Sequence, residues 1–178
     1  NRRALTATPS SAIWNSRARA ARWFLANFPG QALYAAKAND ASPIIEALAE
    51  AGITKFDVAS SVEIARMAAV PNAELYFMNP VKSRVSIRTA FDEFGVRSFA
   101  FDSEDELDKI LEETGRARDL ALYLRIACPN THSLIPLEGK FGVPMAEAPA
   151  LLLRGRQVAK RLGITFHVGS QAVVPAAF

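Results

Sequence analysis

The sequence predicts an α/β fold, and within that class an incomplete (β/α)8 barrel with about six of its eight strands present. Three observations favour this fold. Half of the 178 residues are apolar and 22% are charged, a composition typical of a globular protein with a substantial core. From residue 33 onward, short β-prone runs alternate with helical patterns. These runs lack a clean polar alternation, which is typical of parallel strands that helices cover.

The predicted strands repeat at intervals of about 22 residues. They are expected at 33–37, 55–59, 74–78, 97–101, 121–126 and 164–168. A helix is expected after each of the first five strands, at 43–51, 61–69, 82–94, 104–114 and 148–162. The segment 1–30 is expected to contain an amphipathic helix over about 13–27. We therefore expect residues 1–178 to form a single, partial barrel domain.

Start signals support several of these helices. Ser42 followed by Pro43 has the form of an N-cap residue with proline at the first helical position. The stretches 60–63 and 103–106 both have the Ser-x-x-Glu form of a capping box. The expected helices therefore begin where the strand pattern ends.

Two architectures with parallel strands compete, an open doubly wound sheet and a closed barrel. The turn after the first strand, AND-ASP, has no glycine fingerprint for a dinucleotide, which weakens the open-sheet alternative. Two further units would need on the order of 45 more residues to reach a typical barrel of about 250. An incomplete barrel is therefore favoured.

The first 39 residues contain six bases and no acid, whereas acids outnumber bases in the rest of the chain. A transit peptide and a nucleic-acid contact are alternatives, but the solvated face of an amphipathic helix is the simpler explanation. The apolar face would consist of Ile13, Trp14, Ala18, Ala21, Leu25 and Phe28. No apolar run reaches the roughly 18 residues of a membrane helix. We expect neither a nucleic-acid nor a membrane partner.

The chain has one cysteine, Cys128, and no histidine is grouped with it at metal-ligand spacing. It cannot form an internal disulfide, which suits a reducing, cytoplasmic compartment. We therefore expect no metal site, and packing is the expected role of Cys128.

Functional groups gather at the carboxyl ends of the predicted strands, where barrels place their chemistry. The residues at these positions are Lys37, Asp57, Ser60, Asn79, Asp102, Arg125, His167, Gly169, Ser170 and Gln171. Each of them alone has a structural explanation, because charged residues are mostly exposed or paired. His167 is more informative, since an imidazole that ends an apolar strand before Gly-Ser suits packing against a flat, anionic ligand.

Lys37 indicates the kind of ligand. It is flanked by Tyr34 and by alanines, which predicts a partly desolvated amine. Desolvation favours the neutral, nucleophilic amine that condenses with an aldehyde. Pyridoxal phosphate is the aldehyde cofactor that uses such a lysine. His167 as an aromatic stacking partner and Ser170 as a phosphate ligand would complete about half of its site.

Seven motifs, in order, resemble one known family: YAAKAND, FDVASSVEI, MNP, FAFDSEDELDKI, YLRI, KFGV and FHVGSQ. They are similar to the TIM-type, alanine-racemase-like barrel of the fold-type III pyridoxal-phosphate decarboxylases, which act on ornithine, lysine, diaminopimelate or arginine. The resemblance covers about 30–178. MNP and FDSEDEL look more similar to the ornithine decarboxylase branch than to the diaminopimelate branch.

The resemblance implies a role for each matching residue. Lys37 would be the Schiff-base lysine, His167 would stack on the pyridine ring, and Ser170 would contact the cofactor phosphate. Asp57 and Arg125 would lie near the cofactor ring and the Schiff base, with Glu63 behind them. Catalysis would thus depend on Lys37 and His167. The family's glycine-rich phosphate loop, catalytic cysteine and C-terminal β domain have no counterpart up to Phe178.

The resemblance implies a homodimeric decarboxylase of a basic amino acid, with ornithine as the expected substrate, that makes a diamine in polyamine biosynthesis, and we expect it to be cytoplasmic. Lysine and diaminopimelate are alternative substrates. The 178-residue chain alone is expected to be inactive. A barrel that only carries or regulates pyridoxal phosphate is one alternative function, and a non-catalytic relative of the decarboxylases is another.

Overall fold

The computed structural model describes residues 9–129, 133–135 and 139–174. The chain divides into two compact units, Asn1–Leu75 and Tyr76–Phe178, so the division falls inside one strand. Within the described part of the chain, no helix combines the length and apolar character needed to cross a membrane.

The first unit contains α1 (Pro9–Asn27), β1 (Tyr34–Ala35), the 3-10 turn η1 (Ala36–Ala38), α2 (Ser42–Glu50), β2 (Lys55–Val58) and α3 (Ser61–Ala68). Strands β1 and β2 are parallel, with Tyr34 opposite Phe56 and Ala35 opposite Asp57. Ile44, Leu48, Phe56 and Ile64 are buried and give this unit an apolar core. Strand β1 is shorter than predicted, because the chain turns into η1 at Ala36.

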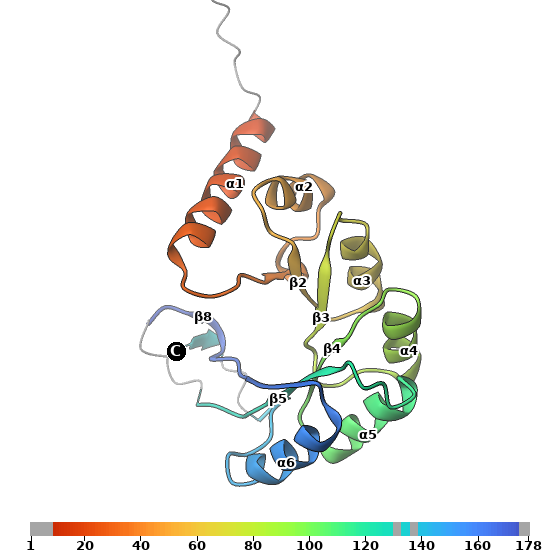
Figure 1. The fold of residues 1–178 in the computed structure, drawn as a ribbon. Helices are drawn as coiled ribbons and strands as arrows, with labels where there is room; N and C mark the ends of the chain where they lie inside the picture. The colour runs from red at the N-terminus through yellow and green to blue at the C-terminus, as the bar shows by residue number, and fades with distance from the viewer. Residues whose placement is uncertain (1–8, 130–132, 136–138, 175–178) are drawn as a thin grey trace, which may run out of the picture. The chain divides into compact units, whose positions relative to one another are not determined.

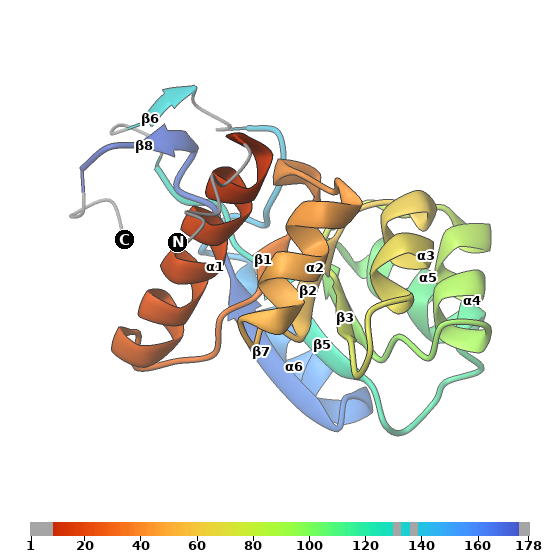
Figure 2. The ribbon, with the colours of Figure 1, turned by 90° about the horizontal axis from the view of Figure 1, so that it is seen from above.

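Helix α1 includes the predicted 13–27 segment and lies beside α2 (Figure 2). Ala18 and Ala21 are buried, as predicted, and their small side chains permit close packing. Leu25 and Phe28, expected on the same face, are 39% and 46% exposed, which corrects that part of the prediction. The two alanines are buried, whereas the bulkier Leu25 and Phe28 remain partly exposed.

The second unit completes β3 (Glu74–Phe77) and adds α4 (Arg84–Asp92), β4 (Ser98–Phe101), α5 (Glu104–Glu113), β5 (Ala121–Arg125), β6 (Ser133–Ile135), α6 (Ala148–Val158), β7 (Arg161–Thr165) and β8 (Ser170–Ala172). Its main sheet has the order β3-β4-β5-β7, with every pair parallel. Helices α4, α5 and α6 follow one another along one side of this sheet (Figure 1). Every residue of β4 is buried, as expected for a strand covered on both faces.

The sixth predicted strand, 164–168, is displaced: β7 spans Arg161–Thr165, and the preceding helix ends at Val158 rather than 162. Gly163 explains the position of β7, because it lies opposite Tyr123 in the ladder. A Cβ at Gly163 would lie 2.8 Å from Tyr123 Cδ1, so the ring packs where a side chain would stand. As a consequence, His167 lies two residues beyond the strand rather than inside it.

A separate two-stranded sheet, absent from the prediction, joins β6 to β8 (Figure 2). The strands are antiparallel, with Ser133 opposite Ala172 and Ile135 opposite Ser170. Each strand has three residues, too few for a period of two to stand out in the sequence. This pairing places Ser170 at the start of a strand.

Two of the three predicted helix starts are confirmed. The Ser60 hydroxyl accepts from the Glu63 N–H at 3.3 Å, and the Ser103 hydroxyl accepts from the Glu106 N–H at 3.2 Å. Ser42 is not an N-cap: it is already helical, Ala41 occupies the cap position, and no side chain caps that end. Asn39 explains the difference, because its Oδ1 accepts the Ala41 N–H and turns the chain there.

This difference between the serines predicts different stabilities. Ser60→Ala removes the acceptor for a helix N–H and should lower the free energy of unfolding by about 1 kcal/mol. Ser42→Ala removes no cap and should change it by less than about 0.5 kcal/mol. Urea unfolding of both variants checks this. Equal losses in the two variants would contradict the cap assignment.

Candidate functional site

Lys37 and Asp57 lie together in the first unit. Lys37 is the middle residue of η1, directly after β1, and Asp57 is in the adjacent strand β2, opposite Ala35. The expectation of a partly desolvated lysine is wrong, because Lys37 is exposed in this structure. Ala36 takes the buried position, with none of its surface exposed, so the next residue of the tight turn faces outward. The amine is therefore accessible.

The turn around Lys37 is held by Tyr34. Its hydroxyl donates to the Asn39 carbonyl at 3.0 Å, which joins the two ends of the AAKAN turn. Burial raises the pKa of Tyr34, although the positive charge of Arg17 opposes the shift. The hydroxyl therefore remains protonated and able to donate at physiological pH.

Glu63 organises the loop that follows Asp57. Its Oε2 accepts the Ala59 N–H at 2.8 Å, while its own N–H is bonded to Ser60. The carboxylate therefore closes the start of α3 and fixes the FDVAS turn. This contact gives Glu63 a structural role next to β2.

Arg125 is the last residue of β5, in the second unit. Its guanidinium carbon lies 5.3 Å from the centroid of the Phe141 ring, within the range of a cation–π contact. Its carbonyl accepts the Val143 N–H at 2.9 Å. Both the side chain and the backbone of Arg125 thus contact the 141–143 segment.

His167 follows β7 and is half-buried. Its Nδ1 accepts the Gly169 N–H at 3.0 Å. A ring nitrogen that accepts carries no proton, so the neutral imidazole has its proton on Nε2. The carbonyl of His167 accepts from Cys128 Sγ at 3.0 Å, which gives the cysteine a contact beyond packing. Ser170 lies three residues further on, at the start of β8.

The predicted site residues thus form two groups. Lys37, Asp57 and Glu63 belong to the first unit, whereas Arg125, His167 and Ser170 belong to the second. Within each unit they gather at or just beyond the carboxyl ends of strands. That the two groups form one site remains a prediction.

Sequence reasoning overlooked a buried lysine in the loop after β3. Lys82 Nζ is fully buried and lies 2.9 Å from Oε1 of Glu106, whose side chain is 4% exposed. The contact is a charge pair without hydrogen-bond alignment, since no donor in the described residues is aligned with this oxygen. The same amine donates to the carbonyls of Asn79, at 3.0 Å, and Ala100, at 2.5 Å.

The environment of Lys82 suits a structural role. Burial lowers its pKa to about 8, and the attraction of Glu106 only partly offsets that effect. A lowered pKa favours the nucleophilic amine, but carbonyls and a carboxylate surround Lys82 and leave no access for a cofactor. The capping-box pattern predicts that the Glu106 side chain bonds back to the N-cap residue. It instead forms ion pairs with Lys82 and Lys109, which the pattern does not predict.

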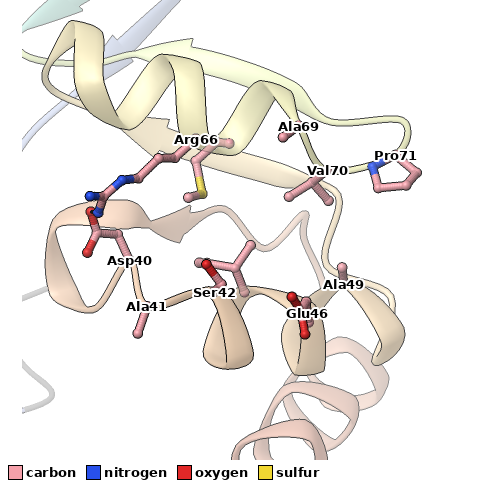
Figure 3. A pocket seen from close by; sticks show the side chains of 11 residues that line it. Asp40, Ala41, Ser42, Glu46, Ala49, Arg66, Ala69, Val70 and Pro71 are labelled. Atoms are coloured by element: carbon pink, nitrogen blue, oxygen red, sulfur yellow. Dashed lines mark hydrogen bonds and ion pairs between the residues drawn. The ribbon is translucent and has the colours of Figure 1, made fainter.

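A pocket of about 550 Å³ lies between α2 and α3 in the first unit (Figure 3). Asp40 and Arg66 form an ion pair at one side of it, and Ile45, Met67 and Val70 contribute apolar surface. Neither Lys37 nor Asp57 lines it. It is therefore distinct from the predicted cofactor site.

The parallel strands with helices between them define a class of protein, the β/α-barrel domains, and polar residues lie at or beyond the carboxyl ends of its strands. A family model agrees with that class and matches residues 14–178, with the description "Pyridoxal-dependent decarboxylase, pyridoxal binding domain". The chain belongs to this family. Its cofactor, pyridoxal phosphate, is the one the sequence predicts.

Curated relatives support the assignment. The chain is 38% identical over 148 residues to a lysine/ornithine decarboxylase of Selenomonas ruminantium, covering 82% of this chain and 36% of that protein. It is 35% identical over 160 residues to ornithine decarboxylase of Mus musculus, covering 88% of this chain and 34% of that protein. The chain thus spans about a third of the length of these relatives.

Solved structures confirm the predicted partial barrel. A mutant of SrLDC in complex with PLP matches with a TM-score of 0.79 and 32% identity, covering 93% of this chain and 42% of that one. Arginine decarboxylase of Paramecium bursaria Chlorella virus matches with a TM-score of 0.80 and 28% identity, covering 93% of this chain and 45% of that one.

The side chains present fit pyridoxal phosphate. Within the described part of the chain, neither the Lys37 amine nor the Ser170 hydroxyl has a hydrogen-bond partner, so both groups are available to a ligand. The His167 ring is held through Nδ1 by the Gly169 N–H. The cofactor needs an amine, a hydrogen-bond donor for its phosphate and an oriented flat ring.

Proposed function

We propose that the protein carrying this chain is a pyridoxal-phosphate-dependent decarboxylase of a basic amino acid, with ornithine as the preferred substrate and a diamine as the product. The observation that carries the proposal is the exposed Lys37 in the turn directly after β1, the strand that pairs with β2 of Asp57, in a chain of the decarboxylase family. Lysine is the principal alternative substrate, because one relative is named a lysine/ornithine decarboxylase.

The bound cofactor supplies an electron sink for the carbanion left by loss of carbon dioxide. Lys37 would hold the cofactor through its amine, and the Ser170 hydroxyl would donate a hydrogen bond to the phosphate. The His167 ring would stack on the pyridine, and the hydrogen bond from the Gly169 N–H to Nδ1 would hold the imidazole in one orientation for that contact.

Asp57 and Arg125 place one negative and one positive charge near the cofactor ring. The carboxylate favours positively charged nitrogen nearby, and the guanidinium attracts the carboxylate of the substrate or the cofactor phosphate. We also propose that the intact protein is a cytoplasmic homodimer. The 178-residue chain alone should then be inactive.

Substrate assays test the function. The intact protein, supplied with pyridoxal phosphate, should release carbon dioxide from ornithine at about 1 per second or faster, a typical enzyme rate. Lysine, arginine and diaminopimelate should react with lower kcat/KM. The isolated chain should show no turnover. Binding of the cofactor by the intact protein without release of carbon dioxide from any of the four would favour the carrier alternative.

A further inference from the structure

The KFGV motif closes a long excursion of the chain between β5 and α6. The chain leaves the sheet at Ile126 and Ala127 and returns at Val143, which forms an isolated parallel bridge with Ile126. The Val143 N–H donates to the Arg125 carbonyl, and the Ala127 N–H donates to the Val143 carbonyl, both at 2.9 Å. The 141–143 segment, which we call the neck, therefore closes the excursion at the carboxyl end of β5.

Asp102 fastens this neck from the neighbouring strand. It follows β4, and its Oδ2 accepts the Gly142 N–H at 2.8 Å across 40 residues of sequence. Gly142 has a φ of +101°, and a Cβ there would lie 2.6 Å from the Ala127 nitrogen. The backbone at this point is thus held between Asp102 on one side and β5 on the other.

The neck contacts one predicted cofactor ligand, Arg125. Phe141, next to Gly142, lies against the Arg125 guanidinium, so the position of the neck sets the environment of that charge. Movement of the neck would therefore reach Arg125 directly.

We infer that Asp102 is a positioning residue for the cofactor site: by holding Gly142 it fixes the 141–143 segment, and through it Arg125. The inference rests on the proposed function for the role of Arg125. It gives Asp102, one of the polar residues at the strand ends, a role that acts through Arg125.

Cofactor affinity in the intact protein tests the inference. Asp102→Ala should weaken pyridoxal phosphate binding about tenfold, because it removes a charged acceptor from a backbone N–H. Asp102→Asn keeps an acceptor oxygen and should remain within about threefold of wild type. Because Asp102 is inferred to act through Arg125, Asp102→Ala should change the logarithm of the cofactor Kd less than half as much in an Arg125→Ala background as in wild type.

Amide hydrogen exchange in the cofactor-free protein provides a second readout. Asp102→Ala should speed exchange at Gly142 and Val143 about tenfold, whereas Asp102→Asn should change it little. Unchanged exchange at Gly142 and Val143 in Asp102→Ala would overturn the inference. This readout does not depend on cofactor binding, whereas a wild-type protein that binds no cofactor would refute the proposed function. Faster exchange with unchanged cofactor affinity would leave only a structural role and would also overturn it.

Discussion

Lys37→Ala is expected to abolish covalent attachment of pyridoxal phosphate and to lower the decarboxylation rate of the intact protein by about 10²–10⁴-fold. The reason is that Lys37 provides the exposed amine at the end of β1. Alanine fits the turn, since its neighbours Ala36 and Ala38 are already alanines, so the fold should persist. Absorbance of the bound cofactor and carbon dioxide release measure the two effects.

Lys55→Ala is the matched control for this variant. Lys55 is in the same unit, at the amino-terminal end of β2, where it forms an ion pair with Glu74. Removing it deletes a lysine without touching the carboxyl ends of the strands. The control should retain cofactor and activity. Loss of cofactor in the control together with retention in Lys37→Ala would contradict the site.

Lys82→Met should have the largest effect on stability, lowering the free energy of unfolding by about 3–5 kcal/mol. It removes the main counter-charge of Glu106 and leaves that carboxylate buried with only Lys109 beside it. It also frees the carbonyls of Asn79 and Ala100. Chemical unfolding monitored by circular dichroism measures the loss.

Two further variants separate the pair from its parts. Adding Glu106→Leu to Lys82→Met removes the stranded charge and should recover most of the loss, since apolar replacement of a buried pair is often neutral. Asp119→Asn breaks the exposed pair with Arg97 and should cost only about 0–1 kcal/mol. A loss in Lys82→Met as small as in Asp119→Asn would show that the buried pair contributes little.

The lowered pKa of Lys82 also sets a pH dependence. Between about pH 8 and its ordinary value of 10.5, the folded protein has released the Lys82 proton while the unfolded chain keeps it. The unfolded state then binds more protons, so this residue makes the protein more stable as the pH rises through that window. The stability difference between wild type and Lys82→Met should therefore grow from pH 8 to pH 10. A shrinking difference would refute the shift.

Local signals in the sequence predicted the alternating elements well. Ser60 and Ser103 begin helices because their hydroxyls bond to N–H groups three residues away, a relation visible in the sequence. The prediction failed where distant contacts decide: β7 starts at Arg161 because Gly163 admits the Tyr123 ring, and β8 forms because β6 lies beside it.

The same limit applies to the site. Lys37 and Arg125 lie at strand ends, as their positions in the pattern predict. The bond from Gly142 to Asp102 and the pair of Lys82 with Glu106 join segments far apart in the sequence. No local sequence pattern predicts either contact, so both become visible only in the folded chain.

Borohydride reduction of the intact protein in the presence of pyridoxal phosphate, followed by peptide mapping, tests whether Lys37 is the lysine that holds the cofactor. Reduction fixes the cofactor to whichever lysine holds it. We expect a single labelled peptide that contains Lys37 and no label at Lys82, whose amine is fully buried. Labelling of Lys82 or of any other lysine, with Lys37 unmodified, would contradict it.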